Sequence, residues 1–428
     1  MSNLFALTFS LVAYAFCARA SLAISNRRLS SVLFACTNLV AVVWLTLLTR
    51  FSEWEMTTIL SLGAEAVGRH VVLISLYVAA IIVGYFLTKW LALRAGWLPW
   101  IAFFYPISLL IAYRYLDAGW KPVVHLLGWP DWAVTATIIG LSYMAFRLSY
   151  IVLEIRNGAV AMPSFADYLG FAFFVPTIVI GPISTYAVHS SSIESVGETT
   201  VPVGRSLLRI IVGATKFLFL ANLANQLSYS GIFFDGKPHH LIDLGVAMVF
   251  YYLYLYCNFS GFCDMGIGLA GLIGIKVKEN FNNPFVARNV QEFWNRWHIT
   301  LSEYTRDVIF APVSKSLLKR LGPRYTNLSI SVGIFCVFLT IGIWHGVGIM
   351  FIVFGLVHAV GVISNHFYKI WMKRLLGPAR YKAYNANPIV NAVSVVLTFL
   401  YVAASFSFFA NSYEGMATIA AAIFKNLG

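Results

Sequence analysis

Two Trp-His pairs are the residues of this sequence best suited to chemistry. His298 follows Trp297, and His345 follows Trp344 at a position 47 residues later. A neutral imidazole can take a proton from a hydroxyl group, and an apolar setting keeps the ring neutral. The neighbours of His345 are apolar or small, so nothing local compensates a charged ring there. His345 is therefore the stronger candidate for a general base, and the structural alternative for it is packing between helices.

The segment around His298 has the pattern of an amphipathic helix from Phe293 to Asp307. At 100° per residue, one narrow stripe collects the polar side chains of Gln291, Asn295, His298, Ser302 and Arg306. The broad opposite face collects Phe293, Trp294, Trp297, Leu301 and Tyr304. Such a helix would bury its aromatic face and turn its polar edge to a water-filled cavity. The alternative is that His298 belongs, with Trp294 and Trp297, to an aromatic belt at a membrane interface.

The composition is that of a membrane protein. The 428 residues are 59% hydrophobic and only 11% charged, and the mean hydropathy is +0.77. The apolar runs are continuous rather than alternating, which indicates helices, and helices satisfy their own backbone in lipid. The net charge of +13 resides in short loops, as in inner membrane proteins, so nucleic-acid binding is not expected. We predict an all-α integral membrane protein.

Twelve apolar stretches are long enough to be considered as spans. They cover residues 4–22, 31–49, 71–93, 97–115, 132–152, 165–185, 206–228, 241–258, 260–275, 328–344, 346–363 and 389–410. A last apolar piece at 413–425 could dip into the membrane. Because no repeat or soluble linker separates these stretches, we expect one domain over residues 1–428 with about 11 to 12 transmembrane helices.

Loop charges predict the orientation of the spans. Residues 276–324 carry nine Lys or Arg against four Asp or Glu, and residues 366–384 carry five against none. Positive loops remain in the cytosol, so both segments should face it. The loops 50–70 and 186–204 lack this excess and are expected outside. Residues 328–363 then leave the cytosol and return, with a sharp turn at His345, which would lie deep in the membrane or towards its outer side.

Several catalytic and metal-binding classes have no support in the sequence. It has no Gly-x-Ser-x-Gly elbow, no His-Glu-x-x-His and no P-loop. The five cysteines lie in or beside apolar runs, with no spacing for a disulfide framework or for zinc. We expect no metal and no bound cofactor.

The motifs resemble those of the membrane-bound O-acyltransferase family. They are Asn258-Phe-Ser-Gly-Phe-Cys-Asp264, Glu279-Asn-Phe-Asn-Asn-Pro284, Glu292-Phe-Trp-Asn-Arg-Trp-His298, Arg306-Asp307 and Trp344-His345-Gly346. The resemblance covers roughly residues 140–350. It is closest to the bacterial branch that holds the alginate O-acetylation and teichoic acid D-alanylation proteins. Asn258 departs from the aspartate common in the acetylating members, and the short length is more like the D-alanylating ones.

The resemblance implies a helical fold around a central tunnel, with a thioester donor from the cytosol and a hydroxyl acceptor from outside. The donor would be acyl-CoA or an acyl-phosphopantetheine carrier protein. In the family, the histidine that matches His345 is the catalytic base or its closest candidate, and the position of His298 lies along the same tunnel. We expect His345 and His298 to be catalytic. His298, with Asn295, would position or polarise the thioester carbonyl or stabilise the developing charge. The tunnel or substrate residues are expected to be Asn295, Trp294, Trp297, Ser302, Arg306, Asp307 and Trp344.

The functional expectation is a multi-pass O-acyltransferase of the bacterial cytoplasmic membrane. It would move an acyl group, with acetyl expected, to an extracytoplasmic polysaccharide or other cell-envelope polymer. Its partners would be the donor or its carrier protein, the polymer or a partner transferase, and membrane lipids. D-alanyl transfer to a teichoic-acid-like polymer is one alternative. A lipid or sugar transporter without chemistry is another, although no inverted repeat is visible.

Overall fold

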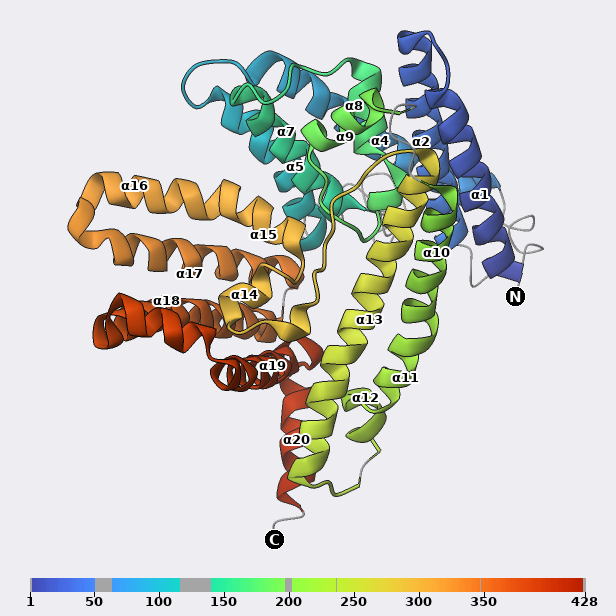
Figure 1. Cartoon of the computed structure of the whole chain (residues 1–428). Helices are drawn as coiled ribbons and strands as arrows, with labels where there is room; N and C mark the ends of the chain where they lie inside the picture. Colours follow the sequence, from blue (N-terminus) through green and yellow to red (C-terminus); the bar gives the residue numbers. More distant parts are fainter. Residues whose placement is uncertain are drawn as a thin grey trace. The chain divides into compact units, whose positions relative to one another are not determined.

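The computed structural model describes residues 2–50, 64–115, 140–196, 202–235, 237–346 and 348–425. Within these ranges all regular elements are helical, and two residues, Phe281 and Trp297, form one isolated β-bridge (Figure 1). The first elements are α1 (Ser2–Leu22), α2 (Arg27–Arg50), α4 (Ala64–Leu91), α5 (Leu98–Tyr115), α7 (Leu141–Arg156), α8 (Phe165–Ala172), η2 (Val175–Thr177) and α9 (Tyr186–Glu194). Next come α10 (Val203–Ala214), η3 (Thr215–Leu220), α11 (Ala221–Gln226), α12 (Tyr229–Ile232) and α13 (Leu241–Ile273).

The last third of the chain carries the motif segment and the C-terminal helices. They are η4 (Pro284–Val286), α14 (Val290–Trp294), α15 (Ile299–Thr305), η5 (Arg306–Phe310), α16 (Ala311–Leu321), η6 (Pro323–Tyr325), α17 (Thr326–His345), α18 (Ile349–Ala386), α19 (Pro388–Ala410) and α20 (Tyr413–Phe424). The turn predicted at His345 is confirmed, because α17 ends there and α18 begins at Ile349.

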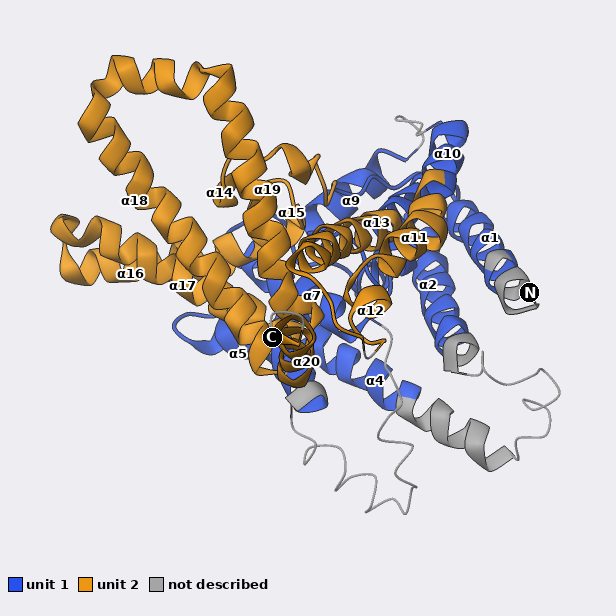
Figure 2. Ribbon diagram, turned by 90° about the horizontal axis from the view of Figure 1, so that it is seen from below, with its two compact units in different colours: residues 1–211, 263–278 blue, residues 212–262, 279–428 orange. Residues whose placement is uncertain are grey.

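The chain divides into two compact units (Figure 2). Unit 1 holds residues 1–211 and 263–278, and unit 2 holds residues 212–262 and 279–428. Two of the three boundaries fall inside helices, within α10 and within α13, and the third follows Lys278. The single domain expected over 1–428 stays a prediction.

Seven of the described helical stretches are long and apolar enough to cross a membrane, and three shorter apolar helices accompany them. The prediction of an all-α membrane protein is therefore confirmed. Most expected spans coincide with a helix, while part of the stretch at 132–152 lies outside the described residues. Three of the twelve expected stretches, 165–185, 241–258 and 260–275, need two corrections that affect the orientation of the chain.

The first correction concerns residues 241–275, which do not form two spans. They form one helix, α13, of 33 residues, which is about 50 Å long at 1.5 Å per residue. We expected a break near Asn258-Phe-Ser-Gly261. Gly261 is instead a close-packing position, because a Cβ there would lie 2.7 Å from the carbonyl oxygen of Gly213. Small residues that let two helix backbones approach leave the helix itself intact.

The second correction concerns residues 165–185, which do not form a span. Helix α8 has only 8 residues, and the chain continues through η2 and irregular backbone to α9. Arg147, buried on α7, donates to the carbonyl oxygen of Ala172 at 3.1 Å and to Thr177 Oγ1 at 3.0 Å. This irregular backbone is tolerated because it is buried in protein.

The two corrections cancel for the motif segment but reverse the side predicted for residues 186–204. With one span fewer on each side of α10, residues 276–324 keep their cytosolic assignment. The backbone N–H of Lys276 donates to Ser192 Oγ at 2.6 Å, so α9 lies at the same end of unit 1 as Lys276. The expectation that loop 186–204 lies outside is therefore inconsistent with a cytosolic Lys276. The absence of Lys and Arg in a loop is weaker than a direct contact as evidence of its side.

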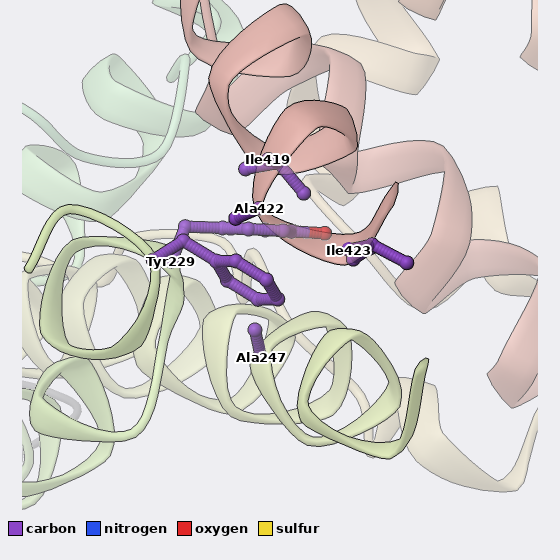
Figure 3. Packing of buried hydrophobic residues seen from close by; sticks show 6 residues of the cluster. Tyr229, Ala247, Ile419, Ala422 and Ile423 are labelled. Atoms are coloured by element: carbon purple, nitrogen blue, oxygen red, sulfur yellow. The ribbon is translucent and has the colours of Figure 1, made fainter. Parts of the chain in front are cut away.

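In unit 2, helix α20 closes a small apolar core against α12 and the first turns of α13 (Figure 3). The buried residues of this core are Tyr229, Phe233, Ala247, Ile419, Ala422 and Ile423. The Tyr229 hydroxyl also shares a hydrogen bond of 2.6 Å with Ser407 of α19. Helices α17, α18 and α19 pack against one another in sequence and, together with the motif segment at residues 279–306, carry the site described next.

Candidate active site

A short backbone bridge holds the His298 segment against the preceding motif. The N–H of Asn282 donates to the carbonyl oxygen of Arg296 at 2.9 Å, and the N–H of Ile299 donates to that of Asn280 at 3.0 Å. Between these bonds the chain turns sharply, and His298 takes a left-handed conformation with φ 46°. That conformation is unfavourable for a residue with a Cβ, by about 1 kcal/mol, and it is held here by the bridge.

Asn280 determines which nitrogen of His298 carries the proton. Its Oδ1 accepts from the backbone N–H of Thr300 at 3.2 Å and from Thr300 Oγ1 at 2.9 Å, so this atom must be the amide oxygen. The Nδ1 of His298 lies 3.2 Å from the same oxygen and therefore donates to it. Neutral His298 is then the Nδ1–H tautomer, and Nε2 keeps its lone pair.

The Nε2 of His298 has no hydrogen-bond partner within the described part of the chain. The side chain is 2% exposed, and the ring of Phe259 packs edge-on at 4.7 Å between centroids. Burial, and next the charge of a protonated His345, lower the pKa of His298 to about 3. The ring is therefore neutral at physiological pH and offers a hydrogen-bond acceptor, not a donor, at Nε2.

His345 lies at the last residue of α17 and is half-buried. The ring of Trp344 packs near both histidines, with centroids 4.5 Å from His345 and 6.2 Å from His298. Phe409 of α19 packs edge-on against His345 at 4.8 Å. The two Trp-His pairs, far apart in sequence, thus form one cluster.

A cavity of about 470 Å³ lies within unit 2, and His298, Trp344 and His345 are not among its lining residues. Its lining includes four of the predicted tunnel residues: Trp294, Asn295, Ser302 and Arg306. Apolar residues of α17, among them Phe338 and Ile341, form another wall. Ile341 is one helical turn before His345, so the cavity extends close to the histidine cluster.

The other predicted site residues lie elsewhere. Trp297 is 4% exposed and packs in an aromatic core, stacked on Phe293 at 5.5 Å. Asp307 pairs with Arg306 at 3.4 Å on the surface. The continuous helix expected from Phe293 to Asp307 is wrong, because α14 ends at Trp294 and α15 starts at Ile299. The turn directs Asn295 and Ser302 to the cavity, while His298 is absent from its lining.

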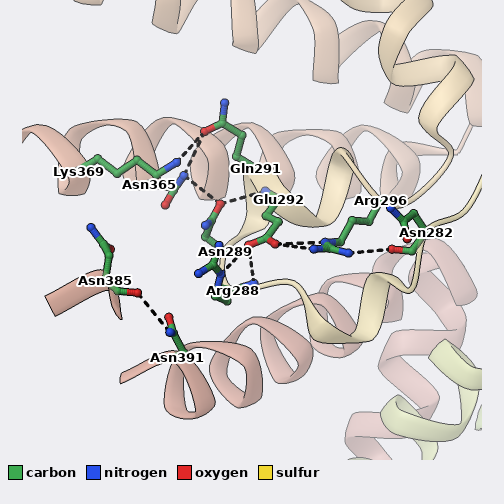
Figure 4. A network of polar contacts seen from close by, with 10 residues as sticks. All are labelled: Asn282, Arg288, Asn289, Gln291, Glu292, Arg296, Asn365, Lys369, Asn385 and Asn391. Atoms are coloured by element: carbon green, nitrogen blue, oxygen red, sulfur yellow. Dashed lines mark hydrogen bonds and ion pairs between the residues drawn. The ribbon is translucent and has the colours of Figure 1, made fainter. Parts of the chain in front are cut away.

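A polar network ties the motif segment to α18 (Figure 4). Lys369 donates to Gln291 Oε1 at 3.0 Å, and Asn365 donates to Asn289 Oδ1 at 3.3 Å. Glu292 pairs with Arg288 at 3.2 Å and with Arg296 at 2.9 Å. Burial raises the pKa of Glu292, but hydrogen bonds from these arginines outweigh it and hold the pKa below its usual value.

Sequence reasoning missed two side chains of this site. Asn280 belongs to the motif Glu279-Asn-Phe-Asn-Asn-Pro284, which could have suggested a role, but not its partner. His358 belongs to none of the motifs, yet it is fully buried against Trp294. Its partner is 64 residues away in sequence, so no local pattern could reveal the contact.

Long apolar helices define a multi-pass membrane protein, and two clustered histidines form its candidate site. The chain belongs to the membrane-bound O-acyltransferase family, whose model matches residues 82–407. The family resemblance predicted from the motifs is therefore confirmed.

Curated relatives agree with this membership. A teichoic acid D-alanyltransferase of Streptococcus thermophilus is 29% identical over 293 residues, which are 63% of this chain and 68% of that protein. A probable alginate O-acetylase of Pseudomonas aeruginosa is 27% identical over 275 residues, 62% of this chain and 47% of that protein. A peptidoglycan O-acetyltransferase of Helicobacter pylori is 31% identical over 206 residues, 46% of this chain and 36% of that protein. The chain is a membrane O-acyltransferase.

Proposed function

We propose that this enzyme transfers an acyl group, acetyl in the simplest case, from a cytosolic thioester to a hydroxyl of an extracytoplasmic polymer. One observation carries the proposal: His298, with its tautomer set by Asn280, and His345 both contact Trp344, next to a cavity lined by the motif residues. The membrane is the cytoplasmic membrane of a bacterium, in keeping with the bacterial relatives.

The cavity is the proposed site of the donor. Asn295, Ser302 and Arg306 offer it amide, hydroxyl and guanidinium groups, and the walls of α17 are apolar. This combination suits a pantetheine arm, which carries amides and ends in an apolar thioester. Arg306 and the basic residues of 276–324 would attract the phosphate groups of acyl-CoA or of a phosphopantetheine carrier protein. The donor is a substrate, and no resident cofactor takes part.

The proposed reaction is a direct acyl transfer. The acceptor oxygen attacks the thioester carbonyl as His345 takes the hydroxyl proton, a C–O bond forms, and the C–S bond breaks. The proton then passes to the thiolate, so an ester and a thiol result. Neutral His298 has no N–H at Nε2 with which to polarise the carbonyl, the role suggested by its sequence position. It is instead suited to accept a hydrogen bond, from the acceptor hydroxyl or from protonated His345.

D-alanyl transfer from a carrier protein is the second candidate. It is favoured by the similarity to a teichoic acid D-alanyltransferase, of which the alignment covers 68%. In either case the acceptor is the envelope polymer itself or a partner transferase that passes the acyl group on.

The test uses purified enzyme in lipid nanodiscs with radiolabelled acetyl-CoA or D-alanyl-carrier protein and cell-envelope polymer. We expect His345→Ala to lower kcat by about 10²–10⁴, the usual contribution of a general base. His240→Asn, which alters an exposed histidine of unit 2 outside this cavity, should retain a kcat near that of the wild type. A His345→Ala enzyme with wild-type turnover and a normal elution profile would remove His345 from the mechanism.

A further inference from the structure

A third buried histidine lies between α14 and α19 in unit 2. His358 of α18 is 0% exposed. The Nε1 of Trp294 lies 3.2 Å from its Nδ1, and Ser405 Oγ lies 2.9 Å from its Nε2. Neither the proposed donor contacts nor the proton transfer at His345 uses this residue.

The three side chains admit only one direction of hydrogen bonding when His358 is neutral. An indole N–H can only donate, so Nδ1 of His358 must be the acceptor. Its proton is then on Nε2, which donates to Ser405 Oγ. The Ser405 hydroxyl in turn donates a hydrogen bond to the carbonyl oxygen of Val402 at 2.7 Å. Both nitrogens of His358 are therefore engaged.

The chain of hydrogen bonds ends on a wall of the cavity. Trp294 is 7% exposed and lines the cavity, and its ring packs edge-on against Phe338 at 5.1 Å. Ser302 donates to the carbonyl oxygen of Trp294 at 2.9 Å. Trp294 is thus held at its backbone by one cavity residue and at its indole nitrogen by His358.

We propose that His358 is a positioning residue for acyl transfer: it holds the indole of Trp294 in one orientation and thereby shapes the inner end of the donor cavity. This rests on the proposed function, because it takes the cavity to be the donor site. A side chain that only filled space at position 358 would not need a hydrogen-bond acceptor like Nδ1, which accepts from the Trp294 indole. An apolar side chain here would leave a buried indole N–H without a partner, which is unfavourable.

The first experiment compares two substitutions of His358. His358→Asn places an amide oxygen near the position of Nδ1 and keeps an acceptor for the indole, whereas His358→Leu removes it. We expect His358→Leu to raise the donor KM about tenfold with a smaller change in kcat, and His358→Asn to restore most of the loss. Tyr401→Phe is the matched control, since it breaks another bond between α18 and α19, to the Val357 carbonyl oxygen, and should leave KM unchanged.

A second measurement reports on the indole without turnover. Enzyme labelled with 5-fluorotryptophan gives a ¹⁹F resonance for Trp294, identified by its loss in Trp294→Phe. We expect the resonance to shift or broaden in His358→Leu and to keep its position in His358→Asn and Tyr401→Phe. Combined with Trp294→Phe, His358→Leu should add little to the KM effect, because both remove the same hydrogen bond.

The outcomes separate the two proposals. An unmoved Trp294 resonance in His358→Leu overturns the positioning role. A loss of kcat by 10² or more in both His358 variants, additive with Trp294→Phe, also overturns it and indicates chemistry at His358. A moved resonance with an unchanged donor KM supports the hydrogen bond and overturns the assignment of the cavity to the donor.

Discussion

At the scale of single residues, the chemistry of the site depends on where protons reside. Asn280 can only accept at Oδ1, so His298 must donate from Nδ1 and keep a lone pair at Nε2. Trp294 can only donate, so His358 must present a lone pair at Nδ1. Both histidines are held neutral and oriented by a neighbour that has a single possible role.

The role of Asn280 can be tested directly. Asn280→Ala should lower kcat roughly ten- to a hundredfold, as expected for loss of a buried hydrogen bond that sets a tautomer. Thr300→Val is the matched control, because it removes the other side-chain bond to Asn280 and leaves His298 in place. Steady-state kinetics with the labelled donor measures both. Equal losses in the two variants would show that Asn280 acts only through the fold of the bridge.

At the scale of elements, the motif Asn258–Asp264 and the following turn to Gly268 are explained by the packing of α13 on α10. Within unit 1, Asp264 pairs with Arg209 at 3.0 Å. A Cβ on Gly268 would lie 2.8 Å from the carbonyl oxygen of Ser206. The glycines thus mark close contact between helices and not a helix break. Sequence reasoning could not distinguish these, because Gly is suited to both.

This packing predicts opposite effects for two glycines of α13. Gly268→Ala should destabilise the protein by about 1–3 kcal/mol, since the added methyl group meets the α10 backbone. Gly245 has open space around it, so Gly245→Ala should be neutral or stabilising by up to about 1 kcal/mol. Apparent unfolding temperatures in detergent measure the difference. A Gly268→Ala protein as stable as the wild type would contradict the close approach.

At the scale of the whole molecule, the side of each loop follows from the number of crossings. With α13 as one span and residues 165–185 as none, α9 should face the cytosol with Lys276, and the loop before α13 should face outside.

Single cysteines in a background without the five native ones test this orientation. An impermeant maleimide should label Ser191→Cys, an exposed position of α9, only from the cytosolic side of oriented vesicles. Lys237→Cys, in the loop before α13, should be labelled only from outside. The reverse pattern would restore the orientation expected from loop charge.

Buried neutral histidines also predict a loss of stability in acid. Burial is the main cause that lowers the pKa of both His189 and His298 to about 3. The pKa of a histidine in an unfolded chain is about 6.5. Below pH 6.5 the unfolded state takes up protons that the folded state does not, so stability present above that pH is lost towards pH 3. At pH 5 each histidine should contribute a loss of about 2 kcal/mol.

The measurement is the apparent unfolding temperature between pH 7.5 and pH 5. His189→Asn should flatten its pH dependence, and His240→Asn, an exposed histidine, should not. Equal slopes in both variants would show that His189 is not the source.

The sequence alone determined the class, the family and the two catalytic candidates, because hydropathy and motif residues are local properties. It also located the turn at His345, since span length and loop charge leave little choice. Only the tertiary structure decided the tautomer of His298, the inclusion of His358 and the contact that places α9 at the same end of unit 1 as Lys276. Each depends on a contact between residues distant in sequence, and neither periodicity nor composition records which partner a polar atom meets.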